Sequence, residues 1–158
     1  MNKITALSSI TIKAAPKDVF KYISQPKYFY LWNPSLRHIT NDEPLKINSQ
    51  FETETVILNN INIKSKNTVT EYEENKKLVL ENSFGLIQYK QIYRLEQSRK
   101  IYTILRLKVD VITKSQILGL TNPVLKRLAN NELKMDLNYL KVVVENKIDY
   151  TNILTAEF

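Results

Sequence analysis

The side chains in this sequence that could take part in chemistry are two tyrosines and a single carboxylate. Tyr89 and Tyr93 share one face of an alternating segment, and Asp136 lies beside an apolar stripe further along the chain. A tyrosine with its usual pKa of about 10 is a better proton donor than base at neutral pH. These three residues are therefore the candidate acid or base groups, although no residue that would activate them is evident.

The sequence gives little support for metal binding or for nucleophilic catalysis. The sequence has no cysteine, and His38 is its one histidine, so disulfides, thiolate sites and paired-histidine metal sites are excluded. We expect His38 at the surface or in a turn. No phosphate-binding glycine loop, paired-carboxylate motif or nucleophile signature is present. We therefore expect no metal and no cofactor, and the catalytic residues, if there are any, are unknown.

The length and composition predict one domain. A chain of 158 residues that is 43% hydrophobic can bury a single core. We place this domain at residues 1–148 and expect 149–158 to be a loose tail. The apolar runs are far shorter than the roughly 20 residues that cross a bilayer, and no signal-type apolar segment follows Met1. These features predict a soluble, cytoplasmic protein.

The net charge of +7 raises the question of a nucleic-acid partner. However, basic and acidic residues are mixed on the same side of the expected strands: Lys64, Lys66, Lys90, Arg94, Arg106 and Lys108 occur with Glu52, Glu54, Glu81, Glu96 and Asp110. Such a mixture is typical of a solvated face with cross-strand ion pairs. We therefore expect no nucleic acid as a partner.

Alternating apolar residues dominate the middle of the chain, which is the period of a half-buried strand. The alternation predicts strands at residues 49–58, 61–72, 77–84, 86–97 and 100–112, separated by the turn signals Asn59-Asn60, Glu74-Asn75, Gly85 and Ser98. Ile4 to Lys13 is a sixth strand and Leu36 to Thr40 a candidate seventh. The connections are too short for crossovers, so the sheet is expected to be antiparallel.

Helices are predicted on both sides of this strand region. A short helix follows Ala15-Pro16, and a second one is expected between Pro26 and Trp32. Asn122-Pro123 supplies an N-cap and a first-turn proline for a long helix that runs to about Lys147. Its apolar stripe consists of Leu125, Leu128, Ala129, Leu133, Leu137, Leu140 and Val144.

Polar residues interrupt the face of the sheet that we expect to lie beneath the long helix. The inward rows are Ile61, Ile63, Ser65, Asn67 and Val69; Leu78, Leu80, Asn82 and Phe84; Ile87, Tyr89, Gln91, Tyr93 and Leu95; and Ile101, Thr103, Leu105, Leu107 and Val109. An unpaired buried amide costs about 1–3 kcal/mol, so several of them indicate a cavity that holds water or a polar ligand group. The alternative is that they pair with one another or with the backbone in a packed core.

Two further residues have alternative interpretations. Trp32 is either a structural plug where the short helices meet the sheet or a contact at a pocket mouth. A carboxylate placed like Asp136 more often lies at the edge of an apolar stripe and pairs with a neighbouring lysine. The alternative is that Asp136 faces the interior as an acid with a raised pKa.

The order of these elements carries a family resemblance. The pattern Ile10-x-Ile12-x-Ala14-Ala15-Pro16-x-x-Val19-Phe20-x-Tyr22-Ile23, followed by Pro26 and Trp32-Asn33-Pro34, resembles the START-like superfamily of polyketide cyclases, lipid-transfer domains and birch pollen allergens (SRPBCC proteins). The segment from Leu125 to Glu145 is similar to its closing helix. The resemblance implies an α+β helix-grip fold, in which a curved antiparallel sheet of six to seven strands wraps around the long C-terminal helix.

The resemblance also implies a function in binding. The expected partner is a small hydrophobic molecule, such as a lipid, quinone or polyketide-like compound, in a tunnel contacted by Trp32, Asn67, Asn82, Tyr89, Gln91, Tyr93, Thr103, Leu125, Leu128 and Leu133. The alternatives are a cyclase- or hydratase-type enzyme that uses Tyr89, Tyr93 or Asp136, and a co-chaperone or ribosome-associated interaction module. We expect a monomer or weak dimer, with transient membrane contact as an option.

Overall fold

The structure is a computed structural model that describes residues 2–57, 60–113 and 122–149. Within these residues, seven strands form one antiparallel sheet in the order β1-β7-β6-β5-β4-β3-β2. The strands are β1 (Asn2–Ile12), β2 (Leu36–Ile39), β3 (Gln50–Ile57), β4 (Ile61–Glu73), β5 (Lys77–Phe84), β6 (Ile87–Ser98) and β7 (Tyr102–Thr113). The helical segments are α1 (Pro16–Ser24), η1 (Pro26–Tyr28), α2 (Phe29–Trp32) and α3 (Asn122–Glu145).

The α+β fold class is confirmed, and each expected strand boundary lies within two residues of the observed one. The turns explain this agreement, because the tight connections need a left-handed backbone. Asn60, Asn75 and Gly85 adopt φ values of 89°, 63° and 56°. Asparagine and glycine reach this conformation at low cost, which makes hairpin turns readable from sequence.

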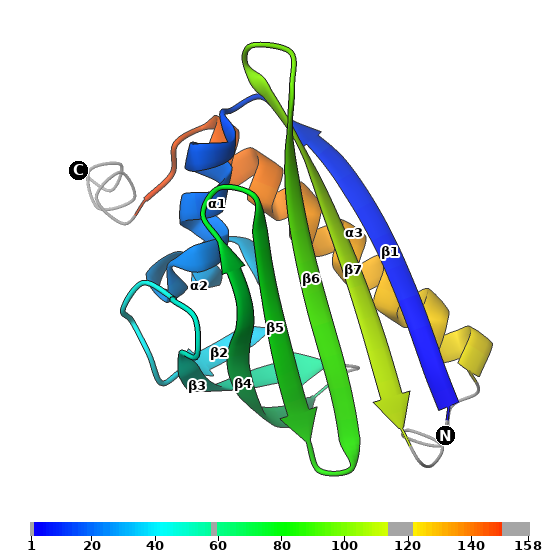
Figure 1. The fold of residues 1–158 in the computed structure, drawn as a ribbon. Helices are drawn as coiled ribbons and strands as arrows, with labels where there is room; N and C mark the ends of the chain where they lie inside the picture. Colours follow the sequence, from blue (N-terminus) through cyan, green and yellow to red (C-terminus); the bar gives the residue numbers. More distant parts are fainter. Residues whose placement is uncertain (1, 58–59, 114–121, 150–158) are drawn as a thin grey trace.

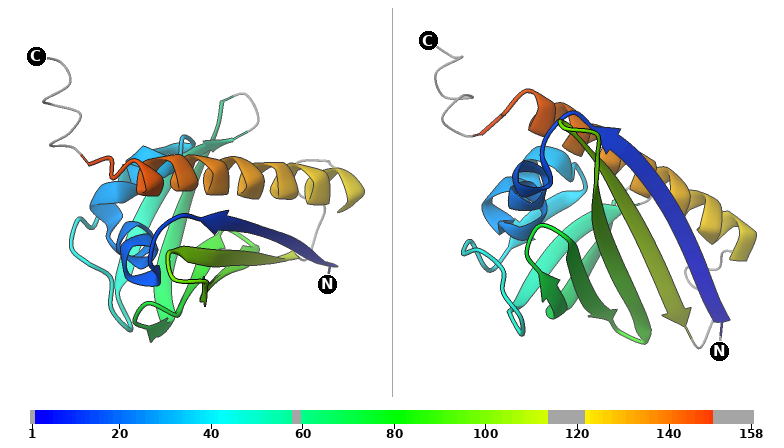
Figure 2. Two further views of the ribbon diagram at one scale, coloured as in Figure 1. Left: turned by 90° about the horizontal axis from the view of Figure 1, so that it is seen from above. Right: turned by 45° about the horizontal axis from the view of Figure 1, so that its top comes forward.

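The sheet curves around α3, which lies across its concave face (Figures 1 and 2). The edge strand β1 packs along this helix. Register shifts occur between Leu36 and His38 and between Val69 and Glu71. Such bulges bend a strand and increase its twist, which helps the β2–β4 side of the sheet to curve.

The core lies between α3 and the inner face. The apolar stripe of the helix supplies the buried residues Leu133, Leu137, Leu140, Val143 and Val144. The sheet supplies others at the expected inward positions, among them Val69, Leu78, Leu105 and Leu107. Ile101 is a correction: it lies in the turn before β7 and is 51% exposed, since β7 begins one residue later.

The segment from α1 to α2 closes one side of the concave face. Phe20 packs edge-on against Tyr72 of β4, with 5.4 Å between ring centroids. The Tyr22 hydroxyl donates a hydrogen bond to the backbone oxygen of Ile148, at 2.8 Å. The indole Nε1 of Trp32 donates to the backbone oxygen of Tyr22, at 3.0 Å. These contacts join α1 to the sheet and to the segment after α3, and they join α2 to α1.

The ends of the chain are described only in part. Of the expected tail, only Asp149 is described, and residues 150–158 lie outside the described residues. The side chain of Asn122, the expected N-cap, also lies outside them, although α3 does begin at this residue. Among the described helices, none combines the length and apolar character needed to cross a bilayer.

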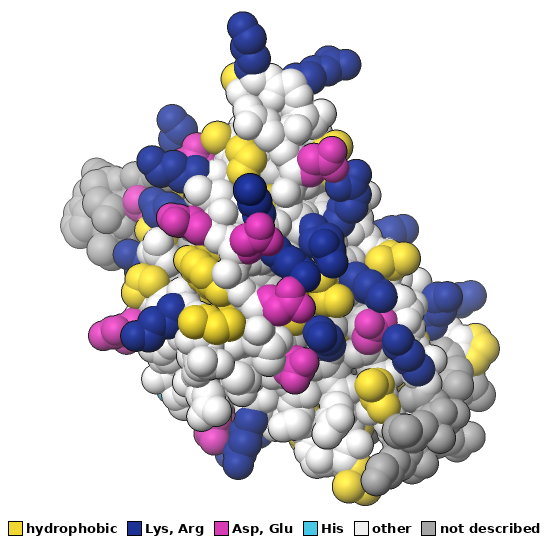
Figure 3. All heavy atoms as spheres, viewed as in Figure 1, with side chains coloured by type: hydrophobic (Ala, Val, Ile, Leu, Met, Phe, Trp, Pro, Cys, Tyr) yellow, Lys and Arg dark blue, Asp and Glu magenta, His cyan; other side chains and the backbone are white. Residues whose placement is uncertain are grey.

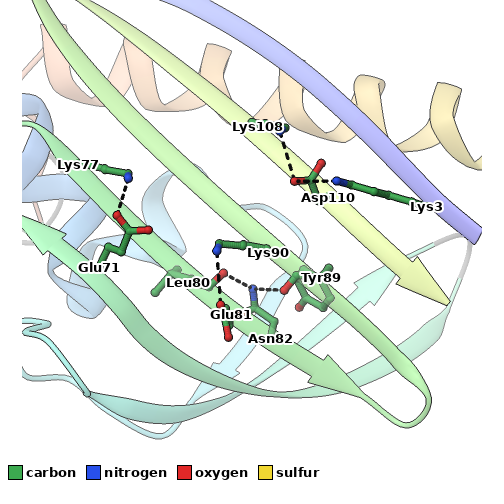
Figure 4. A network of polar contacts seen from close by, with 10 residues as sticks. All are labelled: Lys3, Glu71, Lys77, Leu80, Glu81, Asn82, Tyr89, Lys90, Lys108 and Asp110. Atoms are coloured by element: carbon green, nitrogen blue, oxygen red, sulfur yellow. Dashed lines mark hydrogen bonds and ion pairs between the residues drawn. The ribbon is translucent and has the colours of Figure 1, made fainter. Parts of the chain in front are cut away.

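The outer face of the sheet carries mixed charges, as expected (Figure 3). Lys90 lies opposite Glu81, with 3.5 Å between their charged atoms, and Lys108 and Lys3 flank Asp110 at 3.4 and 3.9 Å (Figure 4). Burial alone would raise the pKa of Asp110, but a hydrogen bond from Thr5 and the two lysines hold it below its ordinary value. The predicted cross-strand pairs are therefore present.

Candidate functional site

A small cavity lies between the sheet and the short helices. Its volume is about 100 Å³. The helices and the segment after them contribute Ile23, Phe29, Trp32, Asn33 and Leu36, and the sheet contributes Phe51, Thr53, Thr55, Asn67, Leu80, Tyr89, Gln91 and Tyr93. The walls therefore combine apolar and aromatic side chains with a few polar groups, a composition typical of ligand sites.

Five of the residues predicted from the sequence meet at this cavity: Trp32, Asn67, Tyr89, Gln91 and Tyr93. Trp32 is 4% exposed, so the same side chain packs in the core and forms part of the cavity wall. A sixth residue, Asn82, lies next to the lining, because its Nδ2 donates to Gln91 Oε1 at 3.4 Å. Strand alternation was sufficient to predict that the strand residues of this set share one face, whereas Trp32 comes from α2.

The other four predicted residues lie elsewhere in the described structure and do not line this cavity. The Thr103 hydroxyl donates to the backbone oxygen of Ala14 at 2.7 Å, which ties β7 to the segment before α1. Leu125 and Leu128 are partly buried near the start of α3, and Leu133 is buried further along. The structure gives Thr103 a structural role and places these leucines in the first half of α3.

Most polar groups of the inner face are already paired. Asn67 Nδ2 donates to the backbone oxygen of Phe51 at 3.2 Å and to Thr53 Oγ1 at 3.1 Å. The Tyr89 hydroxyl donates to Ser65 Oγ at 3.0 Å. This pairing is what the packed-core alternative predicts. However, Asn82 Oδ1 is buried and has no hydrogen-bond partner in the described structure, so the pairing is incomplete.

Asp136 is the unusual ionisable group of the interior. The expected pairing with a lysine is not observed, since its buried Oδ1 has no hydrogen-bond partner and no ion pair of the described residues includes it. Burial, and to a smaller degree the Glu132 carboxylate, raises the pKa of Asp136 to about 8. Burial, followed by the nearby Asp136 and Tyr89, also raises the pKa of Tyr93 well above its usual range. Both groups are therefore mainly protonated at neutral pH.

The cavity wall also contains residues that the sequence analysis missed. Thr53 and Thr55 of β3 line the cavity together with Phe51. The same alternation that identified the inner face of the later strands would have found them. Phe29 belongs to the aromatic stretch that the sequence analysis assigned to a helix. The sequence did not predict which face of that helix would point inward.

His38 is exposed on β2, as expected. Within the described residues, no group of three or more His, Asp and Glu side chains is arranged to hold a metal ion. The candidate site consists of the cavity and its lining, which includes Tyr89 and Tyr93; Asp136 is not one of the lining residues, but its carboxyl acts electrostatically on Tyr93.

The described geometry, a curved antiparallel sheet around a long final helix with a cavity beneath two short helices, is that of the helix-grip fold. No protein-family model and no curated protein matches the chain, but solved structures do. A START superfamily protein from Mycobacterium smegmatis is 18% identical and superposes with a TM-score of 0.75, covering 91% of this chain and 99% of that one.

Two further neighbours come from different groups of proteins. The di-domain ARO/CYC protein StfQ from the steffimycin biosynthetic pathway is 13% identical with a TM-score of 0.76; the match covers 92% of this chain and 51% of StfQ. Ara h 8.0201 is 13% identical with a TM-score of 0.67 and coverages of 90% and 98%. The chain therefore has the START-like fold that the sequence pattern predicted.

Proposed function

We propose that this protein binds a small, mainly hydrophobic molecule in the cavity beneath α1 and α2, in the cytoplasm. The observation that carries the proposal is the cavity lining, in which the apolar and aromatic side chains of Trp32, Phe29 and Leu80 occur together with the polar groups of Gln91 and Tyr93. Burial of apolar ligand surface would supply the affinity, at about 25 cal/mol per Å². The polar groups would select among ligands, because a partner that leaves them unpaired loses affinity.

The cavity must expand to act in this way. Its volume of about 100 Å³ is below the roughly 300–1,000 Å³ of typical ligand sites. We propose that the wall that moves is the α1–α2 segment together with residues 33–48 after it, because its helices are short and contact the sheet and α3 much less extensively than the paired strands contact one another. The ligand would then bind to a more open form of the protein than the one described.

Binding can be tested with N-phenyl-1-naphthylamine, a neutral fluorescent probe that does not favour the basic surface. Thr55→Phe adds a ring to the cavity wall, and we expect it to weaken probe binding by about tenfold through loss of space. Thr11→Phe, the same change at an exposed position of β1, is the matched control. A wild-type protein that does not bind the probe, or equal binding by the two variants, would contradict the proposed site.

The moving wall leads to a prediction for hydrogen exchange. Amide exchange in residues 25–48 should be at least about tenfold faster than in 100–112 and 125–144, because local opening requires less free energy than global unfolding. Bound probe should slow the first segment most. Mass-spectrometric exchange with and without probe measures both effects, and equal protection of all three segments, unchanged by probe, would exclude the moving wall.

One observation favours an enzyme of the cyclase or hydratase type as a second candidate function. Asp136, with a pKa of about 8, could donate a proton at neutral pH. Tyr93 would serve as a hydrogen-bond donor, since its raised pKa makes it a poor base. Once a substrate is found, Asp136→Asn and Tyr93→Phe should each reduce turnover by about 10²-fold or more, and unchanged turnover would remove these roles.

A further inference from the structure

Three cations lie side by side on the outer face of the sheet. Lys77 of β5 is directly opposite Arg94 of β6, and Arg94 is directly opposite Arg106 of β7. Directly opposed residues of antiparallel strands project from the same face and come close together. The row therefore departs from the mixed charge pattern of the rest of this face. Like charges in such positions destabilise a sheet by about 0.2–1 kcal/mol per pair.

Within the described part of the chain, nearby carboxylates form ion pairs only with the two ends of the row, although the charge of Arg94 also helps to lower the pKa of Glu71. Glu71 pairs with Lys77 (Figure 4), and Glu96 pairs with Arg106 at 2.6 Å. The central residue, Arg94, is exposed and makes no ion pair or hydrogen bond with any described residue. A guanidinium between two other cations, with all its donors available, is suited to binding an external anion.

The row borders a hollow in the surface. This hollow, of about 660 Å³, lies between the β4–β5 turn, the strands β6 and β7, and the start of α1. Its basic residues are Lys17, Lys76, Lys77, Arg94 and Arg106. Glu73 and Glu96 are the acidic residues among its described lining, so positive charge is in excess. We call these five residues and the space they border the basic hollow.

A merely solvated surface explains this row of cations less well than a binding site does. On the same face, Lys90 has the opposed Glu81 as its partner, which shows that this sheet can place a carboxylate across from a cation. At the basic hollow Glu73 is opposite Lys77, but Arg94 has a cation directly opposite it on each neighbouring strand. Departures from a local rule that carry a cost in stability are found preferentially at functional sites.

We propose that the basic hollow is a binding site for a phosphate-type anion, with Arg94 as its central contact. The guanidinium matches a phosphate group through two parallel N–H···O bonds, and Lys77 and Arg106 supply further charge on either side. This site is separate from the inner cavity, because the row projects from the other face of the sheet. The anion can belong to a soluble phosphate compound or to a lipid headgroup.

The test compares Arg94→Gln with Arg127→Gln, which removes the same charge from an exposed position on α3. Calorimetric titration with inorganic pyrophosphate at low ionic strength measures the soluble source. Cosedimentation with phosphatidylcholine vesicles, with or without phosphatidic acid, measures the headgroup source. We expect Arg94→Gln to weaken binding by about tenfold or more, while Arg127→Gln stays within about twofold of wild type.

A thermal melt without added anion gives a second readout. Arg94→Gln should be at least as stable as wild type, since it relieves the repulsion along the row, so a loss of binding cannot be attributed to unfolding. Binding of pyrophosphate supports a soluble ligand, and binding of phosphatidic acid vesicles alone supports a headgroup. If wild type binds neither probe, or if both variants lose binding equally, the proposed site is wrong.

Discussion

Replacing Trp32 with alanine is expected to lower the free energy of unfolding by about 3–5 kcal/mol. The indole is 4% exposed and packs against Phe29, with 5.4 Å between ring centroids. Its Nε1 also donates to the backbone oxygen of Tyr22, which the truncation would leave without this donor. The variant therefore loses packing and a buried hydrogen bond together. Urea unfolding followed by circular dichroism measures the change.

Two further variants separate these contributions. Trp32→Phe keeps most of the packing and should cost less, on the order of 1–2 kcal/mol, which also provides a measurement if the alanine variant fails to fold. Tyr139→Ala, at a position that is 49% exposed on α3, should change stability by less than about 1 kcal/mol. A loss below about 1 kcal/mol for Trp32→Ala would show that the indole does not anchor α2.

Replacing Asp136 with asparagine is expected to stabilise the protein at alkaline pH by several kcal/mol. The pKa of Asp136 is about 8 in the folded protein, against an ordinary value of 3.8. Between these values the unfolded chain has lost this proton while the folded chain keeps it, so this group lowers stability as pH rises from about 4 to about 8. Asparagine keeps the shape of the side chain but does not titrate, so it removes this dependence of stability on pH.

The measurement is the difference in unfolding free energy between Asp136→Asn and wild type from about pH 4.5 to pH 9. The contributions of most other titrating groups cancel in this difference. Glu132 and Tyr93 are exceptions, because they interact with Asp136. Asp42→Asn, the same change at an exposed position, is the control. A difference for Asp136→Asn that does not grow with pH would mean that this carboxyl is not protonated in the folded state.

The fold could be predicted closely because local signals agreed with one another. Asn60, Asn75 and Gly85 mark the turns that their left-handed backbone requires, and alternation then fixed which side chains share a face. The same logic brought Asn67, Tyr89 and the other lining residues of those strands to the cavity.

The remaining features depend on distances that one sequence does not encode. Alternation correctly placed Thr103 inward, but the hydrogen bond to Ala14 depends on where the chain returns after β1. The cavity volume depends on how the α1–α2 side chains pack, which periodicity does not specify. The basic hollow depends on register, because Lys77, Arg94 and Arg106 become neighbours only when three strands are aligned.

The proposed binding function is tested most directly by native mass spectrometry of the protein purified from its own host. We expect a population with a retained small molecule, which is released on unfolding and is reduced in the Thr55→Phe variant but not in Thr11→Phe. Retention requires the cavity to open and close around the molecule, so its mass would also identify the chemical class. A spectrum that contains only the bare chain, together with no binding of N-phenyl-1-naphthylamine, would contradict the proposal.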